Sequence, residues 1–280
     1  MKIWKHSMIT GGGSGLGLGL GLGLGLGVRL LRRGANLSVL DLTLTEEART
    51  QLNTAAKAGG GQWLFFEGDV TNELALENSV CLAIEKLGQL DLAVNSASII
   101  NNKTFASLSS AEFRKVIEVN LFGSFNFAKA VLPHLNEHGR LAFVASMAGL
   151  VSNYGYTAYG TSKFGVVGLA TTLRYEYEPR GVGITCVCPP EVKTPMVARE
   201  REPGNADPIS LALKDFAGSL NLDEACDAIL AGIDGGEFLV VPGLRSKLTL
   251  QLARHWPAGF FGFLDFNIRR LLRKHNNSRA

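Results

Sequence analysis

Short apolar segments alternate with helical patterns along most of this 280-residue chain. Parallel strands need long crossover connections, so regular alternation favours a parallel sheet with helices on both faces. The expected strands are residues 3–9, 37–41, 63–66, 90–95, 140–146, 182–187 and 237–241. The expected helices are residues 44–58, 72–87, 109–136, 157–178 and 223–233. Ligands of such sheets bind beyond the carboxyl ends of the strands, which is where we expect a site.

The composition supports one α/β domain. Hydrophobic residues make up 46% of the chain and charged residues 19%, which is enough apolar material for a core. The four cysteines form no C-x-x-C pair, and there is no histidine cluster. We therefore expect no metal site and no disulfide scaffold, and we expect a reducing, cytoplasmic environment.

A glycine-rich segment, TGGGSGLG from Thr10 to Gly17, follows the first expected strand. Glycines between a strand and a helix allow a tight turn and let backbone N–H groups approach a pyrophosphate. We expect Gly11, Gly15 and Gly17 to form such a loop. Glycine spacing alone is weak evidence here, because a repeat that places glycine at every second position begins inside this segment.

The repeat runs from Gly15 to Gly27 as alternating glycine and leucine. Residues 7–28 carry no charge, but about half of them are glycine, so a strand and a loop explain them better than a membrane span. Each glycine costs a helix about 1 kcal/mol relative to alanine. We therefore expect a looped-out or frayed segment after Gly17 rather than a longer helix.

Asp41 ends the second expected strand. A carboxylate there accepts hydrogen bonds from the ribose hydroxyls of an adenine nucleotide and repels a 2′-phosphate. The next residues, Leu42 and Thr43, supply no compensating cation, so NAD is favoured over NADP. The alternative for Asp41 is a solvated helix cap.

Tyr159 and Lys163 are four residues apart in an expected helix, so they share one face. A nearby ammonium stabilises a phenolate and brings the tyrosine pKa towards the working range of an acid or base. Ser146 follows an expected strand, where its hydroxyl can hold a substrate oxygen. Together with the glycine segment and Asp41, this order of residues indicates a catalytic site.

With these motifs, residues 3–242 resemble the short-chain dehydrogenase/reductase family. The resemblance rests on TGxxxGxG, Asp41, the GDVT segment, NSAS from Asn95, EVNLFG around Asn120, Ser146, the Tyr159/Lys163 pair and the segment Pro189–Pro195. It implies a Rossmann-type doubly wound parallel sheet in a single domain over residues 1–242, with a C-terminal aromatic and basic extension over residues 243–280. It also implies NAD(P)-dependent hydride transfer to or from a carbonyl or secondary alcohol.

The resemblance also implies the residue roles. Tyr159 would be the acid or base, Ser146 would hold the substrate oxygen, Lys163 would tune Tyr159, and Asn120 would support a proton relay. The cofactor would contact Gly11, Ser14, Gly15, Leu16, Gly17, Asp41, Asp69, Val70, Asn95, Ala97, Tyr159, Lys163, Pro189, Val192 and Thr194. The family usually forms dimers or tetramers through its long helices, here residues 109–136 and 157–178.

The chain departs from the family pattern at three places. Ser98 replaces a glycine, and Pro190 replaces the glycine that usually follows Pro189, which fixes φ and removes an N–H. The segment CPPEVKTP resembles the branch containing 3-ketodihydrosphingosine reductases and points to a long-chain substrate. Gly17 lies seventeen residues before Gly34, about six more than is usual in the family. An alternative function is therefore a catalytically impaired binding or scaffold protein with the same fold.

The C-terminal extension combines aromatic and basic residues. From Arg245 onward there are eight lysines and arginines against one acid, Asp265. Such a segment suits an amphipathic helix on anionic lipid, or a helix packed over the substrate cleft or a second subunit. We expect no nucleic-acid partner, because no recognised binding fold accompanies the charge. Residues 195–220 are expected to form a lid over the substrate.

Overall fold

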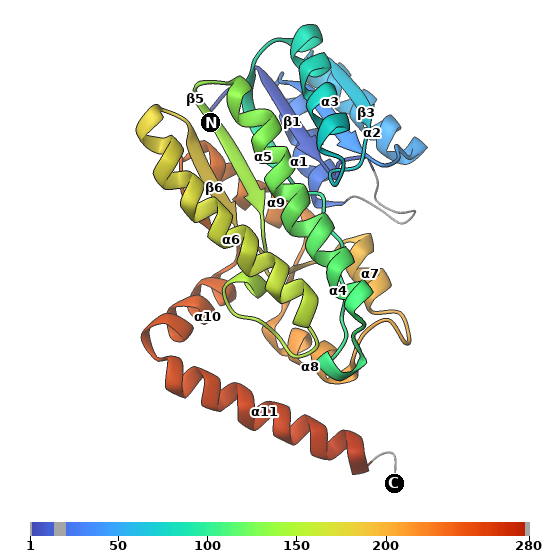
Figure 1. The fold of residues 1–280 in the computed structure, drawn as a ribbon, viewed down its shortest axis with the longest axis vertical. Helices are drawn as coiled ribbons and strands as arrows, with labels where there is room; N and C mark the ends of the chain where they lie inside the picture. The colour runs from blue at the N-terminus through green and yellow to red at the C-terminus, as the bar shows by residue number, and fades with distance from the viewer. Residues whose placement is uncertain (1, 14–20, 278–280) are drawn as a thin grey trace.

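The computed structural model describes residues 2–13 and 21–277. Its centre is a seven-stranded parallel sheet in the order β3-β2-β1-β4-β5-β6-β9 (Figure 1). The strands are β1 (His6–Thr10), β2 (Asn36–Asp41), β3 (Trp63–Glu67), β4 (Leu90–Asn95), β5 (Leu135–Val144), β6 (Gly183–Val187) and β9 (Leu239–Val240). The strand order reverses beside β1, whose neighbours are β2 and β4. This reversal opens a crevice at the carboxyl ends of the strands. The predicted doubly wound parallel sheet is confirmed.

Helices cover both faces of this sheet (Figure 1). They are α1 (Leu22–Arg32), α2 (Glu46–Gly59), α3 (Glu73–Leu87), α4 (Ser110–Ile117), α5 (Gly123–Val131), α6 (Thr157–Tyr177), α7 (Pro195–Glu200), α8 (Pro208–Ala217), α9 (Leu222–Asp234), α10 (Leu244–His255) and α11 (Pro257–Asn277). Ile9 of β1 belongs to a core shared with α1, α2 and α9, whereas Met8 belongs to a core shared with α3, α5 and α6. Alternate residues of each strand therefore anchor helices on opposite faces.

The predicted helix over residues 109–136 is interrupted in the structure. A π-helical turn, Glu118–Phe122, separates α4 from α5, and it places Asn120 in the interior. The helix ends before Pro133, and Leu135 and Asn136 belong to β5. The predicted C-terminal end of this helix at residue 136 was wrong, because the apolar residues around Leu135 fit a strand as well as a helix.

The later part of the Leu-Gly repeat forms the start of α1. This helix begins at Leu22 after the cap residue Gly21, and its residues Gly23–Val28 are all buried. A helix enclosed on all sides needs no polar face, so a two-residue repeat of leucine and glycine is compatible with it. We expected a looped-out or frayed segment after Gly17. Residues 18–20 lie outside the described residues, but residues 22–27 are helical, so the expectation is wrong for this part of the repeat. The described helix itself is not lengthened.

Two short helices and a small second sheet form one wall above the carboxyl ends of the strands. In this region β7 (Glu191–Val192) pairs with β8 (Ser219–Leu220) in parallel, and the intervening chain contains α7 and α8. These helices correspond to the lid expected over residues 195–220.

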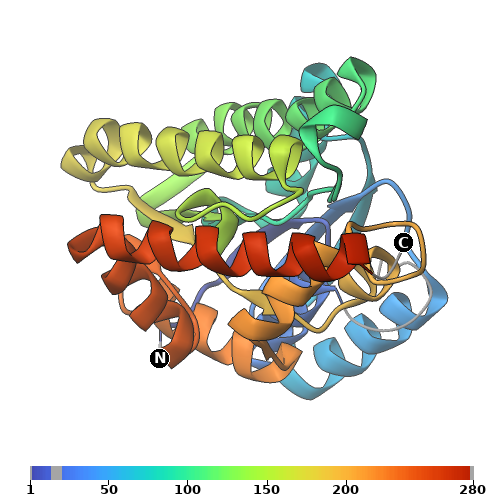
Figure 2. The same cartoon turned by 90° about the horizontal axis from the view of Figure 1, so that it is seen from below.

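The C-terminal extension forms two helices. Leu250 of α10 is buried in the core of the domain, whereas α11 lies across one end of the molecule beside α8 (Figures 1 and 2). Across the described ranges, every helix is too short or too polar to cross a membrane.

Candidate active site

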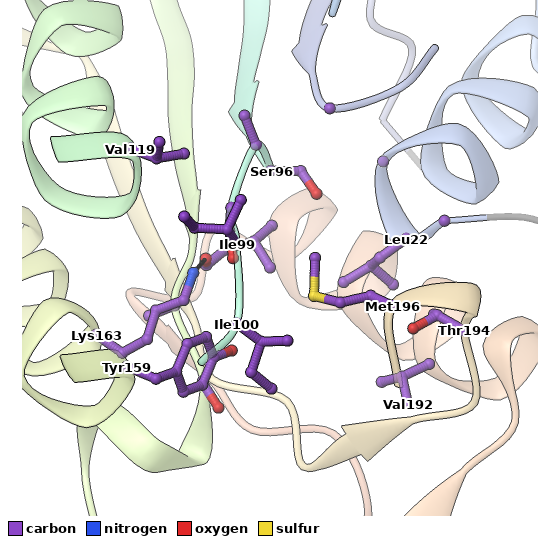
Figure 3. Close-up of a pocket in the computed structure, with 18 of the residues that line it drawn as sticks. Leu22, Ser96, Ile99, Ile100, Val119, Tyr159, Lys163, Val192, Thr194 and Met196 are labelled. Carbon is purple, nitrogen blue, oxygen red and sulfur yellow. Dashed lines mark hydrogen bonds between the residues drawn. The ribbon is translucent and has the colours of Figure 1, made fainter. Parts of the chain in front are cut away.

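A cavity of about 760 Å³ lies at the carboxyl ends of the central strands. Residues following β1, β2, β4, β5 and β6 line it, together with the start of α1 and the lid. Tyr159 and Lys163 project from α6 on one wall, and Leu22 and Thr194 lie on the opposite wall (Figure 3). The topology therefore brings segments that are far apart in sequence into one site.

The glycine loop is built with close backbone contacts. Gly11 has φ +70°, and a Cβ there would lie 2.8 Å from the Ala97 backbone nitrogen. A Cβ on Gly23 would lie 2.6 Å from the Gly11 carbonyl oxygen. Both positions therefore require glycine, because a side chain would push α1 or the Ala97 segment away from the loop.

The register of this loop differs from the sequence prediction. Gly21, Leu22 and Gly23 line the cavity at the start of α1, where we expected Gly15, Leu16 and Gly17. Those three residues and Ser14 lie outside the described residues, so their predicted contacts stay predictions. The structure therefore places the later repeat units at the cavity, and the prediction that these units are the surplus ones was wrong.

The acidic residues expected at the adenine end of the cofactor lie in the cavity wall. The Asp41 carboxylate accepts hydrogen bonds from the Gly13 N–H at 2.9 Å and the Leu42 N–H at 2.7 Å. Asp69 accepts from the Thr71 N–H at 2.9 Å and lines the cavity beside Val70. Both carboxylates therefore lie in the part of the cavity wall where ribose or adenine donors are expected.

The segment after β4 is held against the glycine loop. The Thr10 hydroxyl accepts hydrogen bonds from the N–H groups of Ser96 at 3.0 Å and Ala97 at 3.1 Å. Ala97 lines the cavity as expected. Asn95 does not line it: its side chain is buried and accepts a hydrogen bond from the Ser124 hydroxyl at 2.8 Å. Asn95 therefore supports the cavity wall from behind.

Ser146, Tyr159 and Lys163 meet at the centre of the site. The Ser146 side chain lies close enough to Tyr159 to lower the pKa of the tyrosine hydroxyl. Lys163 Nζ donates to the Val144 carbonyl at 3.0 Å and lies 5.6 Å from the centroid of the Tyr159 ring. All three residues line the cavity, so a substrate oxygen there can reach both hydroxyls.

Burial is the main cause of the pKa shifts of Tyr159 and Lys163. Burial raises the pKa of Tyr159 to about 12, although the nearby Ser146 side chain acts in the opposite direction. Burial also lowers the pKa of Lys163 to about 8. The expectation that Lys163 brings the tyrosine pKa down is therefore not met in this structure, since loss of water around the phenolate outweighs any nearby charge.

Asn120 is buried behind the catalytic residues and does not line the cavity. Its side chain accepts from the Ile99 N–H at 2.8 Å and donates to the Ile99 carbonyl at 2.9 Å and the Ser162 hydroxyl at 3.0 Å. The Ser162 hydroxyl donates in turn to the Tyr159 carbonyl at 2.7 Å. Asn120 therefore ties the segment after β4 to α6, and its predicted part in a proton relay stays a prediction.

The Pro189 segment completes the wall opposite α6. Pro189, Val192 and Thr194 all line the cavity, and their predicted place beside the nicotinamide stays a prediction. The Pro189 carbonyl accepts from the Met147 N–H at 2.9 Å, which fixes this segment against the residue that follows Ser146. Pro190 is accommodated without a cis peptide bond among the described residues.

A buried ionic cluster next to the site was not predicted. Lys214 Nζ lies 2.7 Å from Glu191 Oε2 and 2.5 Å from Glu200 Oε2, and the other oxygen of Glu200 accepts from the Tyr156 hydroxyl at 2.9 Å and from Asn102 at 2.7 Å. The cluster joins both lid helices to the start of α6. In the sequence these charged residues look like solvated surface groups, so nothing in their spacing predicts the cluster.

The family model for short chain dehydrogenases matches residues 5–205, which is more than half of the chain. The chain belongs to the short-chain dehydrogenase family. The matched residues contain the glycine loop, Ser146 and the Tyr159/Lys163 pair, so the resemblance inferred from the motifs is confirmed.

Individual relatives are similar over most of the chain. The oxidoreductase UcpA of Salmonella typhimurium is 30% identical over 72% of this chain and 76% of its own length. The 3-dehydrosphinganine reductase TSC10B of Arabidopsis thaliana is 33% identical over 84% of this chain and 69% of its own length. The protein is accordingly an oxidoreductase of this family, related to sphinganine reductases.

Solved structures agree with the fold. A short-chain dehydrogenase/reductase from Burkholderia phymatum in complex with NAD has a TM-score of 0.76 and 23% identity, covering 90% of this chain and 93% of its own. Levodione reductase has a TM-score of 0.73 and 27% identity, covering 87% of this chain and 98% of its own. Another neighbour, from Burkholderia cenocepacia, has bound NADP, with a TM-score of 0.71 and 24% identity over 85% of this chain and 92% of its own. Relatives in this fold therefore bind either dinucleotide.

Proposed function

We propose that the protein transfers a hydride between a nicotinamide cofactor, preferably NAD, and a carbonyl or secondary alcohol, with Tyr159 as the acid or base. The observation that carries the proposal is the convergence of Ser146, Tyr159 and Lys163 in one cavity whose other end is lined by Asp41. A single cavity with this lining can hold a dinucleotide and a small substrate together.

The residues present fit a dinucleotide. The close backbone packing at Gly11 and Gly23 brings the glycine loop and the start of α1 to the cavity wall, where backbone N–H groups can meet a pyrophosphate. Asp41 would hold the adenosine ribose and disfavour a 2′-phosphate, which supports NAD. Val192 and Thr194 would hold the carboxamide end. When bound, the cofactor supplies or accepts the hydride.

The chain's own residues handle the substrate oxygen. The Ser146 hydroxyl orients that oxygen through a hydrogen bond. In the reduction direction the Tyr159 hydroxyl donates its proton to the oxygen, since its raised pKa keeps it protonated at neutral pH. The ammonium of Lys163 lies close enough to stabilise the tyrosinate that remains. The walls around these groups are apolar, which strengthens both electrostatic effects.

Replacing Tyr159 with phenylalanine tests the proposal. We expect turnover to fall by at least about a hundredfold, because general acid–base catalysis is worth this much, while the affinity for NADH changes little. NADH fluorescence measures binding, and a panel of ketones and secondary alcohols measures turnover. Unchanged turnover would exclude Tyr159 as the acid. Absence of saturable NADH binding by the unaltered protein would favour the alternative of a catalytically impaired scaffold.

A carbonyl or alcohol on a long-chain or lipid-like molecule is the substrate class that we favour. Support comes from the similarity to proteins named 3-dehydrosphinganine reductase and 3-ketodihydrosphingosine reductase, including one from Bos taurus that is 37% identical over 48% of this chain and 41% of its own length. The cavity lining is mainly apolar around the catalytic residues, including Ile99, Ile100 and Met196, which suits such a molecule (Figure 3).

The helix α11 suggests that the protein works at a membrane surface. Phe261 and Phe266 of α11 are exposed, and Arg269, Arg270 and Arg273 lie on the same helix. Aromatic side chains with interleaved cations favour the interface of an anionic bilayer, so α11 is the segment that we expect to touch a membrane. The expected cytoplasmic location of the protein stays a prediction.

A further inference from the structure

A second cavity of about 380 Å³ lies between α11, α8 and the segment that follows Ser146. It shares Met147, Val151 and Asn153 with the catalytic cavity. Met147 follows Ser146 directly, so the two cavities share part of their wall beside the place where a substrate carbonyl would be held. Its volume lies in the range of about 300–1,000 Å³ typical of sites for small molecules.

The lining of this cavity is mostly apolar. Leu213 and Phe216 of α8 face Phe263 and Leu264 of α11 across it, and the Phe216 and Phe263 ring centroids are 5.7 Å apart. Phe216 is nevertheless 70% exposed and Phe263 is 47% exposed. Large apolar side chains that line a hollow and stay exposed are a surface on which an apolar ligand can be buried.

The helix α11 presents one continuous face to the cavity. Lining residues recur at positions 260, 264, 267, 271 and 274, the spacing of a single helical stripe. In a helix packed fully on its domain this stripe would be buried, but Phe260, Leu264 and Leu271 are only partly buried. A ligand beneath the helix would therefore bury more of these three side chains.

Polar groups lie at one end of the stripe. Arg270 and Lys274 line the cavity and are exposed, and none of its described lining residues is acidic. The aliphatic parts of such side chains extend an apolar wall while their charges stay in water. The charges thus mark the solvent end of the cavity, and the Met147 end adjoins Ser146.

We propose that this second cavity is a subsite for the unbranched apolar chain of an elongated carbonyl substrate, held with its carbonyl at Ser146 and Tyr159. The proposal rests on the proposed function and extends it, because it assigns α11 to substrate binding. The wall that this cavity shares with the catalytic cavity favours this ligand over a separate partner. Residues 264 and 271 then set the length of chain that the protein accepts.

The test uses ketones of increasing length, 2-hexanone, 2-decanone and 2-dodecanone, with the full-length protein. We expect kcat/KM to rise by at least about tenfold from the shortest to the longest, mainly through KM. Leu264→Trp fills the cavity and should remove this gain with chain length. Leu252→Trp, at an exposed position on α10 outside the cavity, is the matched control. It should keep the rise of kcat/KM with chain length.

A binding measurement separates this inference from the proposed function. Calorimetric titration with 1-dodecanol and 1-hexanol needs no turnover, and we expect 1-dodecanol to bind at least about tenfold more tightly. Leu264→Trp should abolish the difference in affinity between the two alcohols. Leu271→Trp is the replacement variant if Leu264→Trp does not fold. Equal affinity for the two alcohols, or an unchanged preference in both variants, would overturn the subsite. Absence of turnover with normal chain-length dependence of binding would contradict only the proposed reaction.

Discussion

Lys163 is a buried ammonium whose recorded hydrogen-bond acceptor is the carbonyl of Val144. No carboxylate contributes to its pKa, which burial lowers to about 8. A buried cation without an anionic partner lowers the free energy of unfolding. The protein therefore keeps this lysine at a cost in stability, as is common where a charge serves catalysis.

This cost predicts a pH dependence for Lys163→Met. Folded Lys163 loses its proton near pH 8 and an unfolded lysine near 10.5, so between these values the unfolded state binds more protons and stability rises with pH. Relative to the methionine variant, the unaltered protein should gain roughly 3 kcal/mol from pH 7 to 10.5. Urea unfolding across this range measures the difference. Lys247→Met, at an exposed position, is the control. A stability difference that does not vary with pH would contradict the burial of the charge.

Gly23 supports a second prediction at the scale of single residues. A Cβ there would lie 2.6 Å from the Gly11 carbonyl oxygen, which is backbone and cannot move aside cheaply. Gly23→Ala should therefore weaken NADH binding by at least about tenfold, by displacing the loop that is expected to hold the pyrophosphate.

Gly27→Ala is its matched control within the same repeat. The added Cβ would meet the Leu37 side chain at 2.9 Å, far along α1 from the cavity. We expect this variant to lose some stability but to bind NADH normally, as measured by fluorescence titration. If Gly17→Ala abolished binding and Gly23→Ala did not, the observed register of the loop would be incorrect.

The convergence of Ser146, Tyr159 and Lys163 in one cavity was predictable because local geometry ties them together. Tyr159 and Lys163 share a helix face by their four-residue spacing, and Ser146 comes shortly after a strand. The glycine register was not predictable, since every unit of a two-residue repeat looks alike. The ionic cluster of Glu191, Glu200 and Lys214 was also missed, because it forms only when the lid folds back over the site.

At the scale of elements, α1 shows how the chain accommodates its repeat. From Gly23 to Gly34 there are eleven residues, so the helix keeps the length usual for the family although the repeat is long. Gly25 packs against α9, where a Cβ would lie 2.8 Å from Cys226 Sγ. The alternating leucines Leu24 and Leu26 are buried. The surplus therefore falls between Gly13 and Gly21 and not within the helix.

Deleting three Leu-Gly units tests this placement, and because the repeat is uniform the product is the same whichever units are removed. We expect α1 and NADH affinity to be preserved, since the deletion shortens only the connection before the helix. The deletion shortens the stretch between Gly13 and Gly21 from seven residues to one, which reduces the entropy cost of closing it, so we expect Tm to rise. Calorimetry and NADH titration measure both effects. A large loss of stability would show that the removed units belong to α1.

Element boundaries were predicted best where turn chemistry is strong. The strand Leu90–Asn95 matches its prediction, and α6 differs by a single residue at its end. The long helix expected over residues 109–136 failed at its end, where Pro133 stops the helix and the next residues join β5. Sequence periodicity does not reveal the π-helical turn at Glu118–Phe122, because an inserted residue in a helix depends on tertiary packing.

At the scale of the whole molecule, the outer surface of the helices α5 and α6 carries aromatic residues that the domain does not bury. Phe122, Phe125 and Phe164 are 52%, 47% and 47% exposed, and α4 and α6 lie side by side on this face (Figure 1). Each aromatic side chain can bury about 150–250 Å² in a contact, and a stable interface needs about 800 Å² from each partner. We expect a second copy of the chain, packed helix to helix, to cover these aromatic side chains together with the residues around them.

We therefore expect a homodimer or homotetramer assembled through this face, with a native mass of about two or four times 30.0 kDa. Phe125→Glu places a charge at the centre of the contact, and since a symmetric interface contains each residue twice, it should shift the protein to monomers. Phe105→Glu, at an 83% exposed position outside these helices, should leave the assembly unchanged. Light scattering coupled to size-exclusion chromatography measures the mass. A monomeric unaltered protein, or a Phe125→Glu variant that stays assembled, would exclude this face as the interface.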